Sequence, residues 1–127
     1  MIPIYAHTGE CVGWLDDGSV VDRSGHHVAF IEEGAVFDYG GRYLGVLDEG
    51  YFRDKAGYAV AFVEGATGGP LTPIPQIPPI PPIPRIRPIA PIPPIPPIPP
   101  IPRLTWSSLA WEGFLYGSRL RRGSGGS

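Results

Sequence analysis

Apolar and polar positions recur every 16 residues over the first half of the chain. The four units, which begin at Pro3, read "PIYAHTGECVGWLDDG", "SVVDRSGHHVAFIEEG", "AVFDYGGRYLGVLDEG" and "YFRDKAGYAVAFVEGA". One column holds glycine and two hold aliphatic residues: Gly9, Gly25, Gly41 and Gly57; Val12, Val28, Leu44 and Val60; Leu15, Ile31, Leu47 and Val63. A repeat of this regularity predicts one supersecondary unit for every 16 residues.

Each unit is predicted to form a β-hairpin. A short apolar strand leads into a turn such as "DRSG", where the Asp side chain caps the turn and the Gly takes the left-handed position. A longer strand then returns and ends at a second, acidic turn, which reads "DDG", "EEG" or "DEG". The first unit departs from this pattern, because Ala6 stands where the other units have Asp22, Asp38 and Asp54.

The hairpins are expected to close around a common axis. A lone hairpin is marginally stable, whereas a closed ring of hairpins has no exposed sheet edges. A column of small residues supports closure: Gly13, Ala29, Gly45 and Ala61. The adjacent column is predicted to supply the core: Trp14, Phe30, Val46 and Phe62. The expected fold class is therefore all-β, a shallow barrel with pseudo-fourfold symmetry.

A second pattern follows the repeats, because isoleucine then occupies every third position. These ten residues are Ile74, Ile77, Ile80, Ile83, Ile86, Ile89, Ile92, Ile95, Ile98 and Ile101. Eight of them directly precede a proline, which favours extended backbone. Polyproline II has three residues per turn, so this conformation would place all ten side chains in one stripe.

The isoleucine-rich segment is longer than the head is wide. At roughly 3.1 Å per residue, residues 70–102 span about 100 Å, whereas a 66-residue head should be under about 30 Å across. The segment is therefore expected to protrude, to bend back or to pack against other copies. The interruption "PRIRPIAP" at residues 84–91 is the predicted bend.

The chain ends in an aromatic segment with almost no polar face. Its apolar residues are Trp106, Leu109, Trp111, Phe114, Leu115 and Tyr116. We expect this segment to dock on the small-residue axis of the head or on a neighbouring subunit, with Arg119, Arg121 and Arg122 meeting the acidic turns. The predicted organisation is a head at 1–66, a linker at 67–73, a polyproline segment at 74–103, a docking segment at 104–122 and a tail at 123–127.

Charge divides the chain at the same place as composition. Seventeen of the 18 prolines follow residue 69. Residues 1–69 hold 11 acidic and 4 basic residues, whereas residues 70–127 hold 1 and 6, so the two parts carry −7 and +5. An acidic head and a basic tail can pair within one molecule or between molecules.

Cys11 is the single cysteine, and neither a signal peptide nor an apolar spanning helix is evident, so a cytoplasmic protein is expected.

The repeats and the tail together resemble the 4-fold beta flower proteins. The resemblance rests on the "VGWLDDG" and "VVDRSGHHVAF" repeats, the exit "AVAFVEGATGGPL", the Pro/Ile-rich tail and the final "WSSLAWEGFL". It implies a shallow symmetric β-barrel with hairpins as petals, and it implies no particular activity. Related flower-shaped domains look like the tubby C-terminal domain, whose barrel encloses a hydrophobic helix and which binds membrane phosphoinositides. The acidic head has no Lys/Arg cluster for phosphate, so that activity is not carried over.

Candidate catalytic and metal-binding residues are few. His26 and His27 are adjacent, so on a strand they face opposite sides and do not chelate one ion together. The column of Cys11, His27, Tyr43 and Ala59 is a weak candidate for a metal or nucleophile site. The carboxylate pairs Asp16/Asp17, Glu32/Glu33 and Asp48/Glu49 are interpreted as solvated turn residues. No phosphate loop or nucleic-acid motif is present, and we predict no enzyme activity and no cofactor.

Two functions fit these features. The leading hypothesis is a structural, self-assembling protein in which the isoleucine stripe forms a homo-oligomer or fibre. The alternative is a binding module that holds a hydrophobic ligand, lipid or peptide at the flower centre, with the tail as a plug. In that alternative the "RIRPIAP" stretch, through Arg85, Pro88 and Pro91, also fits the pattern that aromatic-groove proteins bind. Nucleic acid and membranes are not expected partners.

Overall fold

The computed structural model describes residues 1–117 of the chain. Within them the chain forms eight β-strands and one short helix, α1 (Trp111–Tyr116). The strands are β1 (Ile2–Ala6), β2 (Cys11–Asp16), β3 (Ser19–Val21), β4 (His27–Glu32), β5 (Ala35–Asp38), β6 (Tyr43–Asp48), β7 (Tyr51–Arg53) and β8 (Ala59–Phe62). The contacts predicted for Arg119, Arg121 and Arg122, and the tail at 123–127, lie outside the described residues.

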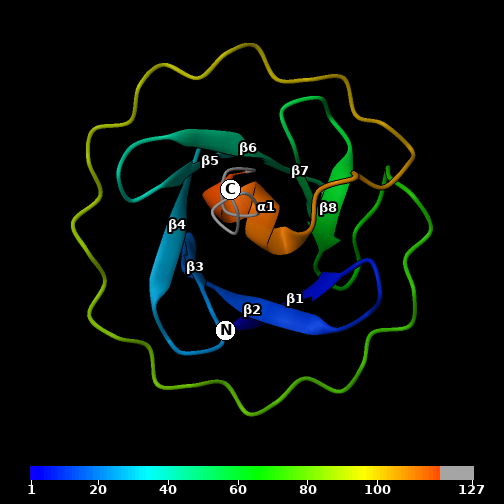
Figure 1. Cartoon of the computed structure of the whole chain (residues 1–127), viewed down its shortest axis with the longest axis horizontal. Coiled ribbons are helices and arrows are strands. Elements are labelled where there is room, and N and C mark those ends of the chain that lie inside the picture. The colour runs from blue at the N-terminus through cyan, green and yellow to red at the C-terminus, as the bar shows by residue number, and fades with distance from the viewer. Residues whose placement is uncertain (118–127) are drawn as a thin grey trace, which may run out of the picture.

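The strands form a closed antiparallel barrel in which each strand pairs with its neighbours in the sequence. β1 and β8 complete the ring, with Tyr5 opposite Phe62 and Ala6 opposite Ala61. Four hairpins therefore surround a central space (Figure 1). The predicted all-β, fourfold-repeated barrel is confirmed.

Aspartate caps the turn inside each of the last three hairpins. Asp22 accepts hydrogen bonds at Oδ1 from the backbone N–H groups of Ser24 and His26, at 2.8 and 3.0 Å. Asp38 and Asp54 accept the equivalent pairs. The side chain thus satisfies backbone donors that the tight turn leaves unpaired.

The acidic turns between hairpins use a different geometry. Asp17 and Gly18 have φ angles of 50° and 79°, and the same pair of positive φ angles recurs at Glu33–Gly34 and Glu49–Gly50. Positive φ at both central residues defines the type I′ turn, whose twist matches that of antiparallel strands. The second acidic residue of each turn is therefore held in the left-handed region.

Each hairpin contains one β-bulge at the same place in its repeat. Ile4 pairs with Gly13 and Tyr5 pairs with Cys11, so Val12 has no partner on β1. The equivalent residues in the other repeats are Val28, Leu44 and Val60. A bulge turns two successive side chains to the same side of the sheet. Accordingly, Val60 and Ala61 both belong to the apolar cluster at the centre of the barrel.

Helix α1 occupies the centre of the barrel (Figure 1). Its residues Trp111, Phe114 and Leu115 are 3–5% exposed and pack in one cluster with strand residues that include Ala29 and Phe52. The Phe52 ring lies 5.3 Å from the Trp111 ring, edge to face. The small residues of the axial column leave the room that this helix needs.

The aromatic column next to the small residues lies outside the axial cluster. Trp14 and Phe62 pack with Tyr5 and Tyr51, and Phe30 packs with Phe37, in two clusters separate from the one around α1. The prediction that this column supplies core residues is confirmed, because Trp14, Phe30, Val46 and Phe62 are all buried, but the core that the aromatic residues form is separate from the cluster around α1. The bulge is the reason, because it turns the small column inward and leaves the following residue on the outer face.

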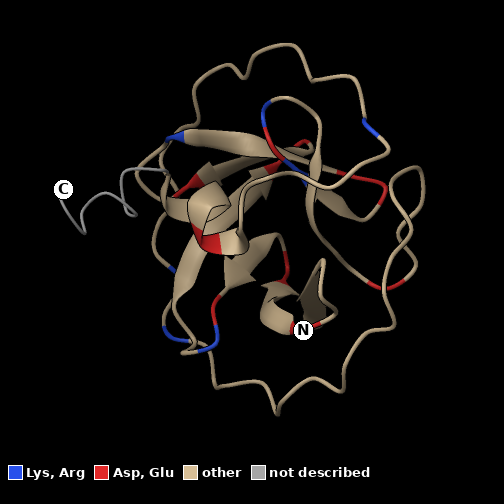
Figure 2. Ribbon diagram, turned by 45° about the vertical axis from the view of Figure 1, so that its right-hand side comes forward, with Lys and Arg blue, Asp and Glu red and all other residues tan. Residues whose placement is uncertain are grey.

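Residues 70–103 surround the barrel as a belt that contains no helix or strand (Figures 1 and 2). The segment thus bends back around its own head, which is one of the three expected outcomes. Its curvature is spread over the whole circuit, rather than being confined to the predicted bend at residues 84–91. Figure 2 shows the acidic residues on the barrel and its turns, whereas most of the belt carries no charge.

The central helix gives a direct test of how the barrel is stabilised. We expect Phe114→Ala to lower the free energy of unfolding by roughly 3–5 kcal/mol, because it leaves a cavity in a fully packed centre. Glu112→Ala alters an exposed residue of the same helix and is expected to change stability by about 0.5 kcal/mol or less. Chemical denaturation followed by circular dichroism measures both. Equal effects of the two substitutions would contradict the central position of α1.

Candidate functional site

Three residues of the belt bind the tips of the hairpins through their backbones. The N–H groups of Gln76, Arg85 and Arg103 donate to the carbonyl oxygens of Gly9, Gly25 and Gly57, at 2.8, 2.9 and 3.0 Å. Proline has no N–H to donate. The three bonds therefore explain why the proline pattern is interrupted at these positions.

The belt has a nine-residue repeat, and each nine-residue unit passes the hairpin tip of one 16-residue repeat of the barrel. Partly buried prolines recur at residues 73, 82, 91 and 100, and each lies over one glycine of the tip column. The tip glycines have φ angles between 88° and 96°. A Cβ atom on Gly9 or Gly25 would lie 2.6 or 2.9 Å from a carbonyl oxygen of the belt. Glycine is thus required both by the turn and by the close approach of the belt.

The third tip departs from this arrangement. The nine-residue spacing places Pro94 where Gln76, Arg85 and Arg103 stand in the other three quarters. Pro94 has no N–H with which to bind Gly41. The belt still passes this tip, because a Cβ atom on Gly41 would lie 3.7 Å from Pro91.

Polar side chains add further links between barrel and belt. The His27 ring lies between Ser19 and the belt, with Nδ1 at 2.8 Å from the Ser19 hydroxyl and Nε2 at 3.0 Å from the Arg85 carbonyl oxygen. Arg87 donates to the carbonyl oxygens of Asp16 and Asp17. Within residues 1–117, the ion pairs join barrel residues to each other. In this described part of the chain, these links between the barrel and the belt therefore use carbonyl oxygens rather than carboxylates.

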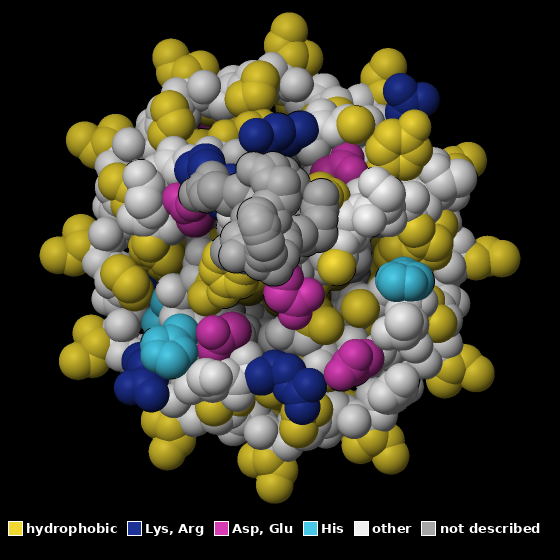
Figure 3. Space-filling model, in the orientation of Figure 1, with side chains coloured by type: hydrophobic (Ala, Val, Ile, Leu, Met, Phe, Trp, Pro, Cys, Tyr) yellow, Lys and Arg dark blue, Asp and Glu magenta, His cyan; other side chains and the backbone are white. Residues whose placement is uncertain are grey.

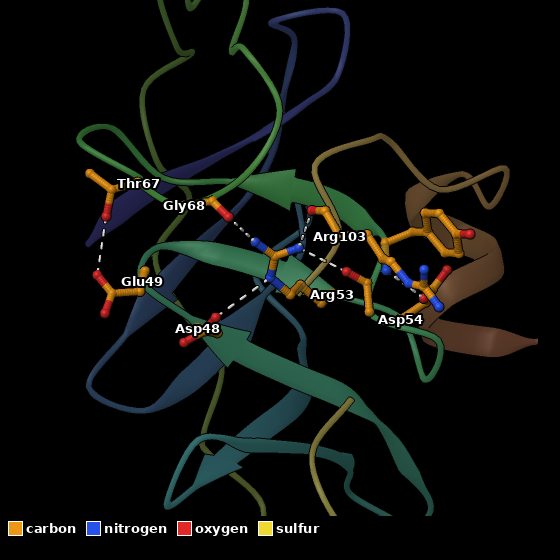
Figure 4. A network of polar contacts seen from close by, with 9 residues as sticks. Asp48, Glu49, Arg53, Asp54, Thr67, Gly68 and Arg103 are labelled. Atoms are coloured by element: carbon orange, nitrogen blue, oxygen red, sulfur yellow. Dashed lines mark hydrogen bonds and ion pairs between the residues drawn. The ribbon is translucent and has the colours of Figure 1, made fainter. Parts of the chain in front are cut away.

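Arg53 is the most deeply buried of these links (Figure 4). Its side chain is fully buried, with Nη1 donating to the carbonyl oxygens of Gly57 and Arg103, both at 2.8 Å. Nη2 donates to Gly68 at 2.9 Å, and Nε lies 3.6 Å from Oδ2 of Asp48. One guanidinium thus joins the barrel to Arg103 at one end of the belt and to Gly68, which lies just before its other end.

The ten isoleucines of the belt point away from the barrel. Their exposed fractions run from 77% at Ile101 to 96% at Ile86, Ile89 and Ile92. In Figure 3 hydrophobic side chains project around the whole rim of the molecule. We call this set of ten residues the isoleucine belt.

The other predicted site residues lie inside or beneath this rim. Gly13, Ala29, Gly45 and Ala61 follow or flank the bulges, and Gly45 approaches Phe114 so closely that an added Cβ would lie 2.9 Å from its ring. Of the predicted docking residues, Trp111, Phe114 and Leu115 lie in the centre of the barrel. Trp106 packs on Phe62 and Tyr51 at the outer face, whereas Leu109 is half-buried and Tyr116 is 38% exposed.

The weaker catalytic candidates are not arranged for catalysis. Cys11 is buried, and burial raises the pKa of its thiol, so the nucleophilic thiolate is disfavoured. The Ser19 hydroxyl beside His27 belongs to a fully buried side chain. Among residues 1–117, no three His, Cys, Asp or Glu side chains gather in a way that would hold a metal ion. The carboxylate pairs lie at the type I′ turns.

A family model described as 4-fold beta flower protein matches residues 2–115, which covers the barrel, the belt and most of α1. The chain belongs to the 4-fold beta flower family. Comparison with curated proteins and with solved structures gave no match. In the described part of this beta flower, no helix has both the length and the apolar character needed to cross a membrane.

The sequence contained a signal for the belt contacts of this beta flower. Gln76, Arg85 and Arg103 are the residues that stand at nine-residue spacings within the proline-rich stretch, with Pro94 in the remaining place. Nine is three turns of a three-residue screw, so one quarter of the circuit spans three isoleucines. The three-residue period is evident from the sequence alone. The nine-residue period can be interpreted only once the belt is known to pass the four glycine tips.

The backbone bond at Arg85 gives a test of how the belt is held. Arg85→Pro is expected to lower the free energy of unfolding by about 1 kcal/mol or more, because it removes the N–H that Gly25 accepts. Arg85→Ala keeps this N–H and is expected to change stability by about 0.5 kcal/mol or less. Urea unfolding of both variants separates the two effects. If the alanine variant lost as much stability as the proline variant, the side chain rather than the backbone would hold the belt.

Proposed function

We propose that this beta flower is a non-enzymatic structural protein that self-assembles through its isoleucine belt. The observation that carries the proposal is the near-complete exposure of ten isoleucines in one continuous rim. Scattered exposed apolar residues are normal on a protein surface, whereas a contiguous set marks an interaction site.

The amount of apolar surface argues for a function. Burying one aliphatic side chain is worth roughly 1.5–3 kcal/mol at about 25 cal/mol per Å², so ten isoleucines correspond to roughly 600–1,200 Å². The largest apolar patch on a typical monomer is about 300–600 Å². The belt lies at or above the upper end of this range, and the hydrophobic effect therefore favours its coverage.

The spacing of the side chains favours a second copy of this chain as the partner. We infer that residues 74–103 follow a polyproline screw, which is supported by isoleucines that stay exposed at every third residue and prolines that return to the barrel at every ninth. Neighbouring isoleucines are then about 9 Å apart. The isoleucine side chains of one belt can pack into the spaces between those of another belt with the same spacing. A second copy of the chain provides such a belt.

Assembly is expected to extend beyond a dimer. The belt runs around the rim, so one neighbour covers only an arc of a few isoleucines and leaves the other arcs exposed. Stable interfaces usually bury about 1,200–2,000 Å² in total, which a single arc does not reach. Several weak contacts around one rim therefore produce concentration-dependent, multivalent association.

The alternative of a hydrophobic ligand at the flower centre involves the same space as α1. Trp111, Phe114 and Leu115 fill that centre in the described structure. A ligand there would have to displace the helix, which would expose these three side chains to water. The described contacts therefore favour the rim over the centre as the interaction site.

Light scattering coupled to size-exclusion chromatography tests self-assembly. We expect the average mass of the wild-type protein to rise with concentration. A variant with Ile77→Gln, Ile80→Gln, Ile86→Gln and Ile89→Gln should show a smaller rise in average mass than the wild type, because these side chains are at least 92% exposed and their loss removes part of the apolar rim while it leaves the barrel intact. The matched control replaces the same four residues by leucine, which keeps the apolar surface and should keep the assembly.

Salt distinguishes apolar association from charge pairing. Sulfate strengthens hydrophobic association, whereas added salt weakens contacts between an acidic head and a basic tail. We therefore expect ammonium sulfate to increase the average mass of the wild-type protein. A wild-type protein that stays monomeric at all concentrations, or a glutamine variant that assembles as the wild type does, would overturn the proposal.

A further inference from the structure

A cavity of about 580 Å³ lies between the barrel and one quarter of the belt. Its barrel wall comes from β5, β6 and β7 and from the turn at Glu33 and Gly34, and its outer wall from residues 95–100 and Pro102. This volume is within the range of about 300–1,000 Å³ that is usual for small-molecule sites. The cavity is separate from the centre of the barrel, and Ile95 and Ile98 of the isoleucine belt form part of its outer wall.

Comparison between the four repeats shows what this quarter lacks. Val46 lines the cavity, and the equivalent residues of the other repeats are Trp14, Phe30 and Phe62. Each of these aromatic side chains is buried on the outer face of the barrel. Ala35, in the same wall, stands where the next repeat has Tyr51. The cavity therefore occupies a place that the fold elsewhere fills with an aromatic ring.

The polar groups of the wall are predominantly acidic. Glu33 and Asp48 line the cavity together with Arg53, which leaves one negative charge in excess. The Arg53 side chain is fully buried, and within residues 1–117 its Nε has no hydrogen-bond partner, since Oδ2 of Asp48 is 3.6 Å away. The Asp48 carboxylate is thus not engaged in a short bond with Arg53, and its side chain is 41% exposed.

We propose that this cavity binds a small aromatic amine. The aromatic ring would occupy the space between Val46 and the prolines of the belt, where the other repeats place Trp or Phe. The ammonium group would lie against the carboxylates of Asp48 and Glu33, which accept charge-assisted hydrogen bonds. Tyr43 completes the wall and presents an aromatic ring that also attracts a cation.

The charge of the wall sets the preference among aromatic ligands. An aromatic carboxylate would face the two carboxylates of the wall, while Nη1 and Nη2 of Arg53 already donate to carbonyl oxygens and its Nε lies beside Oδ2 of Asp48. A neutral ring gains the apolar contacts alone. The expected order of affinity is therefore cation, then neutral ring, then anion. This site does not depend on the proposed self-assembly.

Isothermal titration calorimetry of the full-length protein with three related probes tests the proposal. Tryptamine, indole and indole-3-propionate share one ring system and differ in charge. We expect saturable binding of tryptamine, with an affinity about tenfold or more above that of indole-3-propionate. Val46→Phe restores the residue of the second and fourth repeats and should abolish binding, and circular dichroism shows whether this variant keeps the wild-type fold.

A second pair of variants tests the charge without altering the volume of the cavity. Asp48→Asn is expected to weaken tryptamine binding about tenfold and to leave indole binding unchanged. Asp16→Asn makes the same change at the equivalent position of the first repeat, outside the cavity, and should leave both affinities unchanged. Absence of saturable tryptamine binding, unchanged tryptamine affinity in Val46→Phe or in Asp48→Asn, or tighter binding of indole-3-propionate would overturn the proposal.

Discussion

The structure depends on the close approach of an extended chain to four glycine turns. At each tip a glycine with positive φ leaves room for a carbonyl group or a proline ring of the belt. A side chain at any of these positions would be strained by the backbone, and at Gly9, Gly25 and Gly57 it would also collide with the belt. The barrel repeats every 16 residues and the belt every nine, and the glycine tips are where the two repeats meet.

The belt in turn accounts for the aromatic residues on the outside of the barrel. Trp14, Phe30 and Phe62 would be exposed on a bare barrel, yet each is at most 6% exposed. The barrel therefore has two apolar layers, an inner one around α1 and an outer one beneath the belt. Proline suits this outer cover because it is rigid before folding, and a belt with few N–H groups is a poor template for strand pairing with other chains.

Most of the barrel could be predicted from the sequence, because hairpin turns have local chemical signatures. Asp22, Asp38 and Asp54 indicated the capped turns, and the column from Gly9 to Gly57 indicated the left-handed positions. The bulge at Val12 and its equivalents has no such signature, because an apolar residue fits either face. That single register shift explains why the small column lies at the axis, whereas the aromatic column next to it lies on the outer face.

The position of the belt could not be derived from the residues that form it. Ten isoleucines at every third position indicate that their side chains share one side of the belt. Whether that side faces the barrel or the solvent depends on what the prolines contact. The backbone links at Gln76, Arg85 and Arg103 join residues far apart in the sequence. Local propensity does not report such contacts. The cavity beside Val46 likewise depends on a long-range arrangement, since it exists only once the belt closes over the third repeat.

The position of α1 has a consequence for how the protein is made. The ribosome releases the four hairpins before the belt, and Trp111, Phe114 and Leu115 emerge after both. Until then, the nascent barrel has a hollow interior lined with aliphatic and small side chains. Native packing is thus completed only after the belt has been synthesised, because α1 follows the belt in the chain.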